Sequence, residues 1–329
     1  MNVQNVDSNG NNLTVISTFA GCGGSSLGYK LAGYKELLAV EWDNNAVETF
    51  KLNFPDVPVY HGDITKLTGK ECMRLAGTKI GELDVLDGSP PCQGFSTAGK
   101  RKFDDPRNSL FKEYARILKE LQPKVFVMEN VTGMIKGVMK QAYLQIIKTL
   151  RECGYRANGQ VMNAMYYNVP QSRQRIIIIG VRNDLNIEPS HPKPQTKPIP
   201  IQKIIGHLEN QGGPKLTACS SKYWPLLKYG ESASKYHPKG HLFGMIKLNP
   251  FKPSPTILKS CGNPVCHWSQ PRFLSKKELL LITSFPENFI IIGEIGKVRD
   301  RIGNSVPPNL MKAIAEHIKN NILIQRNKQ

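Results

Sequence analysis

The sequence has no stretch of about 18 apolar residues, the length that a membrane-spanning helix needs. Residues 2–12 are polar and lack the apolar segment of a secretion signal, so neither a membrane span nor secretion is expected, and the chain is placed in the cytoplasm. With 40% hydrophobic and 21% charged side chains among 329 residues, the chain can bury a sizeable core. A mainly disordered protein is therefore excluded.

Cysteine is present but in a pattern that predicts no cross-links. Seven cysteines in a long chain without a secretion signal are an odd number, so a disulfide framework is not expected. Cys261, Cys266 and His267 form a lone C-x4-C-H, which lacks the second ligand pair of a zinc site. We therefore expect ordinary packing there and no metal.

Acidic side chains are scarce. Against 44 Lys and Arg stand 26 Asp and Glu, which gives a net charge of +18 and favours a polyanionic partner, with nucleic acid as the first candidate. Residues 1–180 carry 22 basic and 17 acidic side chains, whereas residues 181–329 carry 22 and 9. The span 193–259 holds eleven Lys and only two acids, and it is interpreted as a loop-rich lysine surface.

From Thr14 to Gly180 short β-branched runs alternate with helical stretches, the pattern of β-α units around a mostly parallel sheet. Apolar positions recurring at intervals of three and four predict helices over 109–121 and 138–153. Strands are predicted at Thr14–Thr18, Leu37–Glu41, Val57–Tyr60, Asp84–Asp87, Val125–Glu129, Gln160–Asn163 and Arg175–Val181.

The amino-acid composition changes after Val181. Residues 189–271 are rich in Pro, Gly, Ser and Lys, which predicts a smaller domain of irregular β structure behind a Pro-rich linker. Helical patterning returns over 275–285, where Ser and Glu form a capping box, and over 307–324, a helix expected to pack on the first domain. The resulting domains are residues 1–182, 183–270 and 271–329.

A glycine-rich turn, residues 17–24, follows the first strand and leads into a helix, so backbone can approach a ligand closely there. Ser26 stands where a dinucleotide-binding loop would place a third glycine. Glu41, at the end of the second strand, can accept hydrogen bonds from a ribose diol, and Trp42 can lie on a purine. Asp63, after the third strand, can accept from an adenine amino group. These features fit S-adenosylmethionine better than NAD.

The segment Gly88 to Ser96 follows the fourth strand and carries Cys92 directly after two prolines. A rigidly presented thiol at the carboxyl edge of a sheet is typical of a nucleophile, whereas a structural cysteine needs no such flanking residues. Glu129 ends another apolar strand and emerges at the same edge. Arg173 and Arg175 precede an apolar strand, and their alternation places both on one face.

With these motifs the sequence resembles the DNA (cytosine-5) methyltransferase family from its first strand to its last helix. The motifs, in the family's order, are Phe19-Ala20-Gly21-x-Gly23-Gly24, Pro90-Pro91-Cys92-Gln93-Gly94-Phe95-Ser96, Glu129-Asn130-Val131, Gln171-x-Arg173-x-Arg175 and Arg301-x-Gly303-Asn304-Ser305-Val306. The resemblance implies an α/β fold, the Rossmann-like class I S-adenosylmethionine-dependent methyltransferase fold with a mostly parallel seven-stranded sheet. It also implies that the lysine-rich second domain is an irregular, β-rich target-recognition domain.

The resemblance also assigns roles to residues. Its catalytic residues would be Cys92, Glu129, Arg173 and Arg175. The residues that bind the cofactor would be Phe19, Ala20, Gly21, Gly23, Gly24, Glu41, Trp42, Asp63, Ile64, Pro90, Leu110, Asn304, Ser305 and Val306. The residues that contact DNA would be Gln93, Ser96, Lys100, Arg101 and Lys102, within a loop that closes on the duplex.

The implied reaction begins with a cytosine rotated out of the duplex. The thiolate of Cys92 would add to C6 and Glu129 would assist at N3. Arg175 would help to stabilise the thiolate and would hold the exocyclic oxygen of the base. The methyl group of S-adenosylmethionine would pass to C5, leaving S-adenosylhomocysteine.

Two departures from the family's pattern are visible. Asn168 stands where the family often has glycine, and asparagine is the next-best residue for a left-handed backbone. Lys277, Leu281 and Thr283 stand where the family usually carries Arg and Gln, so the role of that helix in ordering the recognition domain is open.

The leading interpretation is a monomeric enzyme of the nucleoid-associated cytoplasm that acts on double-stranded DNA. It would be the modification half of a restriction system, whose endonuclease acts separately, or an orphan methylase. One alternative is a tRNA cytosine-5 methyltransferase of the same architecture, against which residues 93–96 and the large insert argue. Another is a catalytically silent DNA-binding regulator, which predicts loss of Cys92, Glu129 or the glycines, all of which are present.

Overall fold

The computed structural model describes residues 12–91, 109–137, 139–259 and 264–324. The chain forms two compact units. The first comprises Met1–Met162, Gln174–Lys193 and Met311–Gln329, and the second comprises Asn163–Arg173 and Pro194–Leu310. The units therefore divide the chain at other points than the boundaries placed at 182/183 and 270/271. Both units are assembled from segments far apart in sequence.

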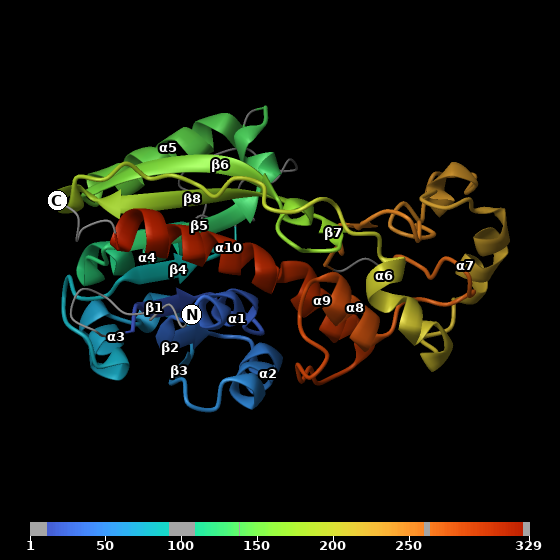
Figure 1. Ribbon diagram of the computed structural model, residues 1–329, viewed down its shortest axis with the longest axis horizontal. Coiled ribbons are helices and arrows are strands. Elements are labelled where there is room, and N and C mark those ends of the chain that lie inside the picture. The colour runs from blue at the N-terminus through green and yellow to red at the C-terminus, as the bar shows by residue number, and fades with distance from the viewer. Residues whose placement is uncertain (1–11, 92–108, 138, 260–263, 325–329) are drawn as a thin grey trace. The chain divides into compact units, whose positions relative to one another are not determined.

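The first unit is built on a seven-stranded sheet of order β3-β2-β1-β4-β5-β8-β6 (Figure 1). β1 lies parallel to β2 and β4, β2 lies parallel to β3, and β4 lies parallel to β5, whereas β8 runs antiparallel to β5. This confirms the mostly parallel seven-stranded sheet. The strands are β1 Thr14–Thr18, β2 Lys35–Glu41, β3 Val59–His61, β4 Val85–Gly88, β5 Val125–Val131, β6 Tyr155–Asn163 and β8 Gln174–Arg182.

Capping side chains and a left-handed glycine set the ends of helices in this unit. Asp43 caps α2 by accepting from the Ala46 amide, and α3 ends at Gly77, whose φ of 63° suits glycine. α4 has the predicted bounds because its apolar positions recur without interruption. The helices are α1 Gly24–Leu31, α2 Asn44–Asn53, α3 Gly69–Ala76, α4 Ser109–Leu121, α5 Met139–Glu152 and α10 Pro308–Ile318.

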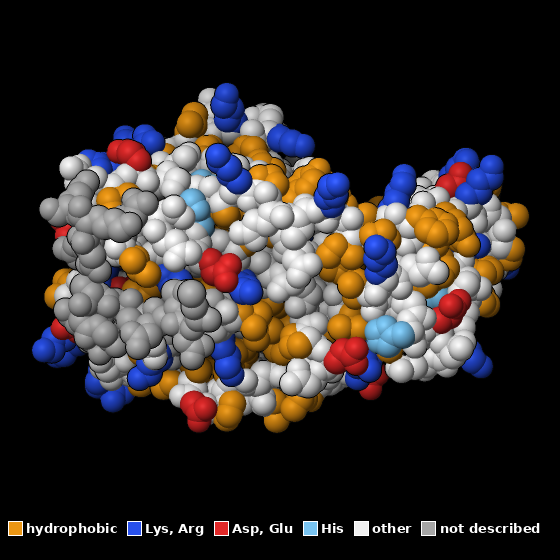
Figure 2. Space-filling model, viewed as in Figure 1, with side chains coloured by type: hydrophobic (Ala, Val, Ile, Leu, Met, Phe, Trp, Pro, Cys, Tyr) orange, Lys and Arg blue, Asp and Glu red, His pale blue; other side chains and the backbone are white. Residues whose placement is uncertain are grey.

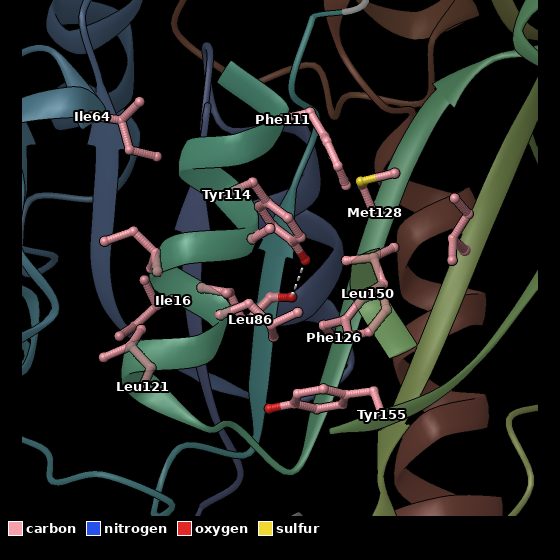
Figure 3. Packing of buried hydrophobic residues seen from close by; sticks show 14 of the residues in the cluster. Ile16, Ile64, Leu86, Phe111, Tyr114, Leu121, Phe126, Met128, Leu150 and Tyr155 are labelled. Carbon is pink, nitrogen blue, oxygen red and sulfur yellow. Dashed lines mark hydrogen bonds between the residues drawn. The ribbon is translucent and has the colours of Figure 1, made fainter. Parts of the chain in front are cut away.

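The main core lies between the sheet and helices such as α4 (Figure 3). Tyr114 is fully buried, and its hydroxyl donates to the carbonyls of Leu86 (3.3 Å) and Val127 (3.2 Å), so its one polar atom is satisfied in the core. Phe126 meets Tyr155 edge to face with ring centroids 5.3 Å apart. The aromatic side chains therefore hold α4 against β4 and β5.

The last helix returns to the first unit, as its pattern suggests. α10 continues as a π-helical turn over Lys319–Leu323. The buried Lys319 donates to the Ala32 carbonyl at the end of α1 (3.2 Å), and Tyr34 donates to the Ala315 carbonyl (3.0 Å). The C-terminal segment is thus hydrogen-bonded to the turn between α1 and β2.

The second unit is irregular, as expected, but it has little regular β structure among its described residues. One two-stranded parallel sheet joins β7 (Gln171–Ser172) to β9 (Ser254–Pro255), and the other strand contacts are isolated bridges. Its helices are α6 Gln202–Ile205, α7 Ala218–Tyr223, α8 Lys276–Ile282 and α9 Ile295–Asn304, of which only α8 was predicted. α8 begins with the predicted capping box of Ser275 and Glu278. In neither unit is any described helix long and apolar enough to cross a membrane.

Candidate active site

The turn after β1 has the backbone conformation that its glycines predict. Phe19, Gly21 and Gly23 have φ values of 55°, 57° and 94°, in the left-handed region. A Cβ on Gly23 would lie 2.4 Å from the ring of Phe54, so no larger residue fits there. A Cβ on Gly21 would meet no atom within 4 Å, so this backbone faces open space. The turn therefore offers accessible backbone to a ligand, between the buried Ala20 and the start of α1 at Gly24.

Glu41 is only 8% exposed and its carboxylate is already bonded to the backbone. Oε2 accepts from the Gly21 amide at 2.8 Å, while Oε1 accepts from the amides of Trp42 (2.8 Å) and Asp43 (2.9 Å). A carboxylate has about four acceptor positions, so one remains for a hydroxyl. Glu41 thus fixes the glycine turn and can still accept from a ribose. The indole of Trp42 is 77% exposed and free to lie on a flat ring.

The remaining predicted cofactor residues of the first unit differ in exposure. Asp63 is exposed and caps a short 3-10 turn by accepting from the Thr65 amide (2.9 Å). Ile64 is 4% exposed and belongs to the core, so only its backbone is within reach of a ligand. Pro90 is buried, and Leu110 is a partly buried side chain at the edge of the core. The exposed Asp63 therefore lies at the end of β3, where an adenine acceptor is expected.

Below the glycine turn lies a set of buried acids that sequence reasoning missed. Burial raises the pKa of Asp87 to about 8, and the hydroxyl of Tyr29 donates to its Oδ1 (3.4 Å). Burial raises the pKa of Glu36 to about 7, against the hydrogen bond from the Ser26 hydroxyl (2.9 Å) that lowers it. At neutral pH a carboxyl with a pKa of about 8 is mostly protonated and one with a pKa of about 7 is about half protonated, so the fold favours the neutral form of Asp87 above all. The only sign of these buried acids in the sequence is that Asp87 and Glu36 each stand beside apolar strand residues.

Glu129 and Arg175 meet on neighbouring strands. β5 and β8 pair so that Arg175 lies opposite Val131, and Arg175 Nε contacts Glu129 Oε1 at 2.9 Å. Both side chains are largely buried, 14% and 8% exposed, so the ion pair is held in a fixed geometry. The structure thus brings together two residues that lie 46 positions apart by their numbers.

Asn130, next to this pair, was part of a quoted motif but received no role. Its side-chain amide donates to the Pro90 carbonyl at 3.0 Å, and both residues are buried. Asn130 therefore fixes the backbone directly ahead of the predicted nucleophile. Cys92 itself, with Gln93, Ser96, Lys100, Arg101 and Lys102, lies outside the described residues.

Arg173 does not share a strand face with Arg175, contrary to the expected alternation. The strand is interrupted at Arg173, between β7 and β8, and this residue belongs to the second unit. Its side chain is 1% exposed and donates to the carbonyls of Gly303 (2.8 Å) and Ile257 (3.5 Å). Arg173 thus connects two of the quoted motifs inside the second unit, a contact that positions backbone.

The C-terminal motif lies in the second unit as well. Asn304 ends α9 and is exposed, Ser305 is half-buried, and Val306 is buried. A Cβ on Gly303 would come within 2.8 Å of the Lys259 amide nitrogen, so glycine permits this close backbone approach. Their contribution to the cofactor site remains a prediction.

Both departures from the family's pattern have structural explanations. Asn168 has a φ of 56°, which confirms the left-handed backbone expected for this residue. The hydroxyl of the buried Thr283, at the end of α8, accepts from the side-chain amide of Gln171 at 3.2 Å. α8 is therefore tied to the strand β7 by a residue other than the family's usual Arg or Gln.

Comparison with known proteins agrees with this arrangement. The family model described as C-5 cytosine-specific DNA methylase matches residues 13–320. Type II methyltransferase M1.HphI of Haemophilus parahaemolyticus is 35% identical over 333 residues, covering 93% of this chain and 86% of that protein. Type II methyltransferase M.NgoPII of Neisseria gonorrhoeae is 32% identical over 336 residues, covering 94% and 96%.

Solved structures show the same fold. A structure described as a DNA modification methyltransferase encoded within a prophage (E. coli) has a TM-score of 0.77 at 24% identity and covers 94% of this chain and 99% of that chain. Spodoptera frugiperda DNMT2 has a TM-score of 0.66 at 19% identity, covering 92% and 98%. At these identities the likeness concerns the fold alone.

Proposed function

Because the chain belongs to the C-5 cytosine-specific DNA methylase family, we propose that it methylates C5 of one cytosine within a specific sequence of double-stranded DNA. The observation that carries this proposal is the pairing of Glu129 with Arg175 beside Asn130, whose amide holds the Pro90 carbonyl. These contacts bring together the backbone of Pro90, two positions before Cys92, and two residues that we propose bind the base. S-adenosylmethionine would supply an electrophilic methyl group on its sulfonium.

The chain's own residues prepare the cytosine. As the thiolate of Cys92 bonds to C6, electron density moves toward N3. Glu129 in its protonated form, with the proton on Oε2 and Arg175 on Oε1, then gives that proton to N3. Arg175 occupies Oε1 of Glu129, which directs Oε2 to the base. C5, now electron-rich, takes the methyl group. Loss of the C5 proton to water and return of the N3 proton to Glu129 then break the bond between C6 and sulfur, which releases 5-methylcytosine and the Cys92 thiolate.

The cofactor residues fit S-adenosylmethionine by their chemistry. Glu41 retains an acceptor position, Trp42 presents an exposed ring, and Gly21 leaves space beside its backbone. Asp63 offers an exposed carboxylate at the end of β3. No group among these supplies positive charge for a pyrophosphate, which favours an adenosyl sulfonium over a dinucleotide.

A lysine surface of the second unit supports DNA binding. Figure 2 shows Lys and Arg side chains, in blue, spread over the face of the molecule that it presents. Lys222, Lys228 and Lys239 are exposed, and the same stretch of chain carries two exposed aromatic side chains, Tyr229 (49%) and Phe243 (69%). The one acid between them, Glu231, is paired with Lys235 at 2.5 Å, and the hydrogen bond from this lysine lowers its pKa to about 2. Phosphate contacts from such lysines would offset the cost of extruding the base, roughly a few kcal/mol.

This surface has its own test. Changing Lys222, Lys228 and Lys239 together to Gln should weaken duplex binding and reduce the slope of log affinity against log salt by about 3, since each phosphate contact contributes about 0.9. Binding of S-adenosylhomocysteine should not change. An unaltered salt slope would place the DNA elsewhere.

The reaction is tested by transfer of labelled methyl to duplex DNA and to tRNA. We expect label on DNA, abolished by Cys92→Ser and retained by the control Cys153→Ser. Cys153 is a half-buried thiol whose Sγ contacts the Ala115 carbonyl of α4 at 3.7 Å. Glu129→Gln should bind the cofactor but turn over slowly. Label on tRNA alone, or full activity of Cys92→Ser, would contradict the proposal.

We further propose that the enzyme works as a monomer, as the modification partner of a separate restriction endonuclease or as an orphan. Its relatives of the type II class support this setting. Bisulfite sequencing of DNA from cells expressing the protein would identify the methylated sequence. Resistance of that DNA to an endonuclease of the same specificity would establish the link to restriction.

A further inference from the structure

The segment that carries Asp63 has little structure of its own. Residues 62–68 join β3 to α3, and among them only Ile64–Lys66 form a single 3-10 turn. The Gly62 amide donates to the Glu41 carbonyl at 3.0 Å, which fixes the start of the segment. Beyond Asp63, the side chains of Ile64 and Leu67 are buried in the main core, and the carbonyl groups of these two residues are bound by another element.

That element is α4, through Arg116. Nη2 of Arg116 donates to two carbonyls of the segment, those of Ile64 (3.1 Å) and Leu67 (2.8 Å). Nε donates to Glu113 at 2.7 Å, and Nη1 donates to Glu120 at 3.1 Å. The guanidinium is thus held by two acids of its own helix while its outer nitrogen binds backbone. Such fixed, charge-assisted geometry suits a residue that positions others.

Glu120 extends the same contact. Its Oε2 accepts from the Gly69 amide at the start of α3. A Cβ on Gly69 would lie 2.5 Å from the Glu120 Cβ, so glycine allows this close approach. Arg116 and Glu120 together fix both ends of the stretch from Ile64 to Gly69, directly behind Asp63.

We propose that Arg116 is a positioning residue for the adenine end of the cofactor, acting through the segment that presents Asp63. The inference rests on the proposed function, in which Asp63 accepts a hydrogen bond from the adenine amino group. A hydrogen bond tolerates only a few tenths of an ångström in its length, so a small shift of the backbone that carries Asp63 would remove most of this selectivity. Because its charge is paired with Glu113 and Glu120, Arg116 serves this role rather than attracting DNA.

The test compares Arg116→Met with Arg74→Met. Arg74 is a matched control because it pairs with Glu71 at the surface of α3, where its side chain is 67% exposed. Binding of S-adenosylhomocysteine is measured by calorimetry, beside S-inosylhomocysteine, which has no adenine amino group. The wild-type protein should prefer the adenine compound by roughly tenfold, the factor that one hydrogen bond of about 1.4 kcal/mol provides.

Arg116→Met should weaken binding of S-adenosylhomocysteine by about tenfold and reduce the preference for adenine to near unity, while Arg74→Met changes neither. Arg116→Lys, which keeps the positive charge and one donor nitrogen, should restore part of the preference. The maximal rate at saturating cofactor should remain within about twofold of wild type, since the reacting groups are untouched.

Equal weakening of both ligands by Arg116→Met, or an unchanged preference, would overturn the positioning role while leaving the proposed function intact. A wild-type protein that binds neither ligand would overturn both. A melting temperature lowered without any change in the preference would show that Arg116 only stabilises the fold.

Discussion

Each of the two units is stabilised internally by a different kind of interaction. In the first, parallel ladders and a core of side chains such as Phe126 and Tyr114 fix the backbone. In the second unit, hydrogen bonds and ion pairs of buried polar side chains fix much of the backbone. Arg272 binds both oxygens of the fully buried Glu278, at 2.8 and 2.9 Å, and Arg173 donates to distant carbonyls. The comparison teaches that a region with little regular β structure is fixed by side-chain hydrogen bonds. In such a region, removing one partner leaves a buried charge unpaired.

The largest expected effect comes from the core of the first unit. Phe126 is 0% exposed and contacts both Tyr114 and Tyr155. Phe126→Ala should lower the free energy of unfolding by about 4 kcal/mol, through lost burial and the cavity that remains. Chemical denaturation would measure it, with Ile80→Ala, an exposed side chain, as a nearly neutral control. A loss below about 1 kcal/mol would mean that the core closes around the gap.

The second prediction tests the polar interactions of the other unit. Arg272→Met should cost about 3 kcal/mol of unfolding free energy because it leaves the carboxylate of Glu278 buried without its partner. Adding Glu278→Leu should restore much of this loss, since an apolar pair avoids the cost of a buried charge. Lys277→Met, which breaks the surface pair with Glu287, serves as the control. If the double variant is no more stable than the single one, the ion pair is not the source of the loss.

The third prediction concerns the close backbone approach within the second unit. Gly303→Ala should cost about 2 kcal/mol because its Cβ would lie 2.8 Å from the Lys259 nitrogen, which cannot move as a side chain could. Gly296→Ala is the matched control in the same helix, since its Cβ would meet only the end of Arg299 at 3.9 Å. Alanine there should be neutral or stabilising. Equal melting temperatures for the two variants would show that residues 258–259 shift freely.

The last prediction concerns the pH dependence of stability. Asp87, with a pKa raised to about 8, binds a proton in the folded protein that the unfolded chain releases near pH 4, so the stability it contributes is present at low pH and is lost as pH rises to about 8. Asp87→Asn stays neutral and should flatten the fall in melting temperature between about pH 6 and 8, leaving the part due to Glu36. The exposed Asp56→Asn should follow the wild-type curve. Parallel curves for Asp87→Asn would mean that Asp87 is ionised.

Features fixed by neighbouring residues were predictable from the sequence. α4 and the capping box of α8 follow from periodicity and cap chemistry, which act over a few residues. The strand β6 begins at Tyr155 rather than at Gln160, because its first residues are paired within the sheet although their own pattern is weak. α9 was missed because two glycines and a run of charges hide its apolar positions, Val298 and Ile302.

Contacts between distant residues could not be predicted in the same way. The alternation of Arg173 and Arg175 is visible in the sequence. The break between β7 and β8 is not, because it arises when β7 pairs with β9 and β8 pairs with β5 and β6. Arg116 has the pattern of a solvated cation on an amphipathic helix, and only the folded chain brings it to Ile64 and Leu67. The bonds that Glu41 makes to three amides likewise require the turn to be folded.

The bonds of Lys319 and Ala315 to the turn after α1 have a consequence for synthesis of the protein. The first unit begins near the N-terminus and is completed by residues beyond Met311, after the whole second unit has been made. At roughly 5–20 residues per second, the ribosome needs on the order of ten seconds or more to make the intervening chain. During that time the end of α1 lacks its final partner, so the second unit emerges while the first is still incomplete.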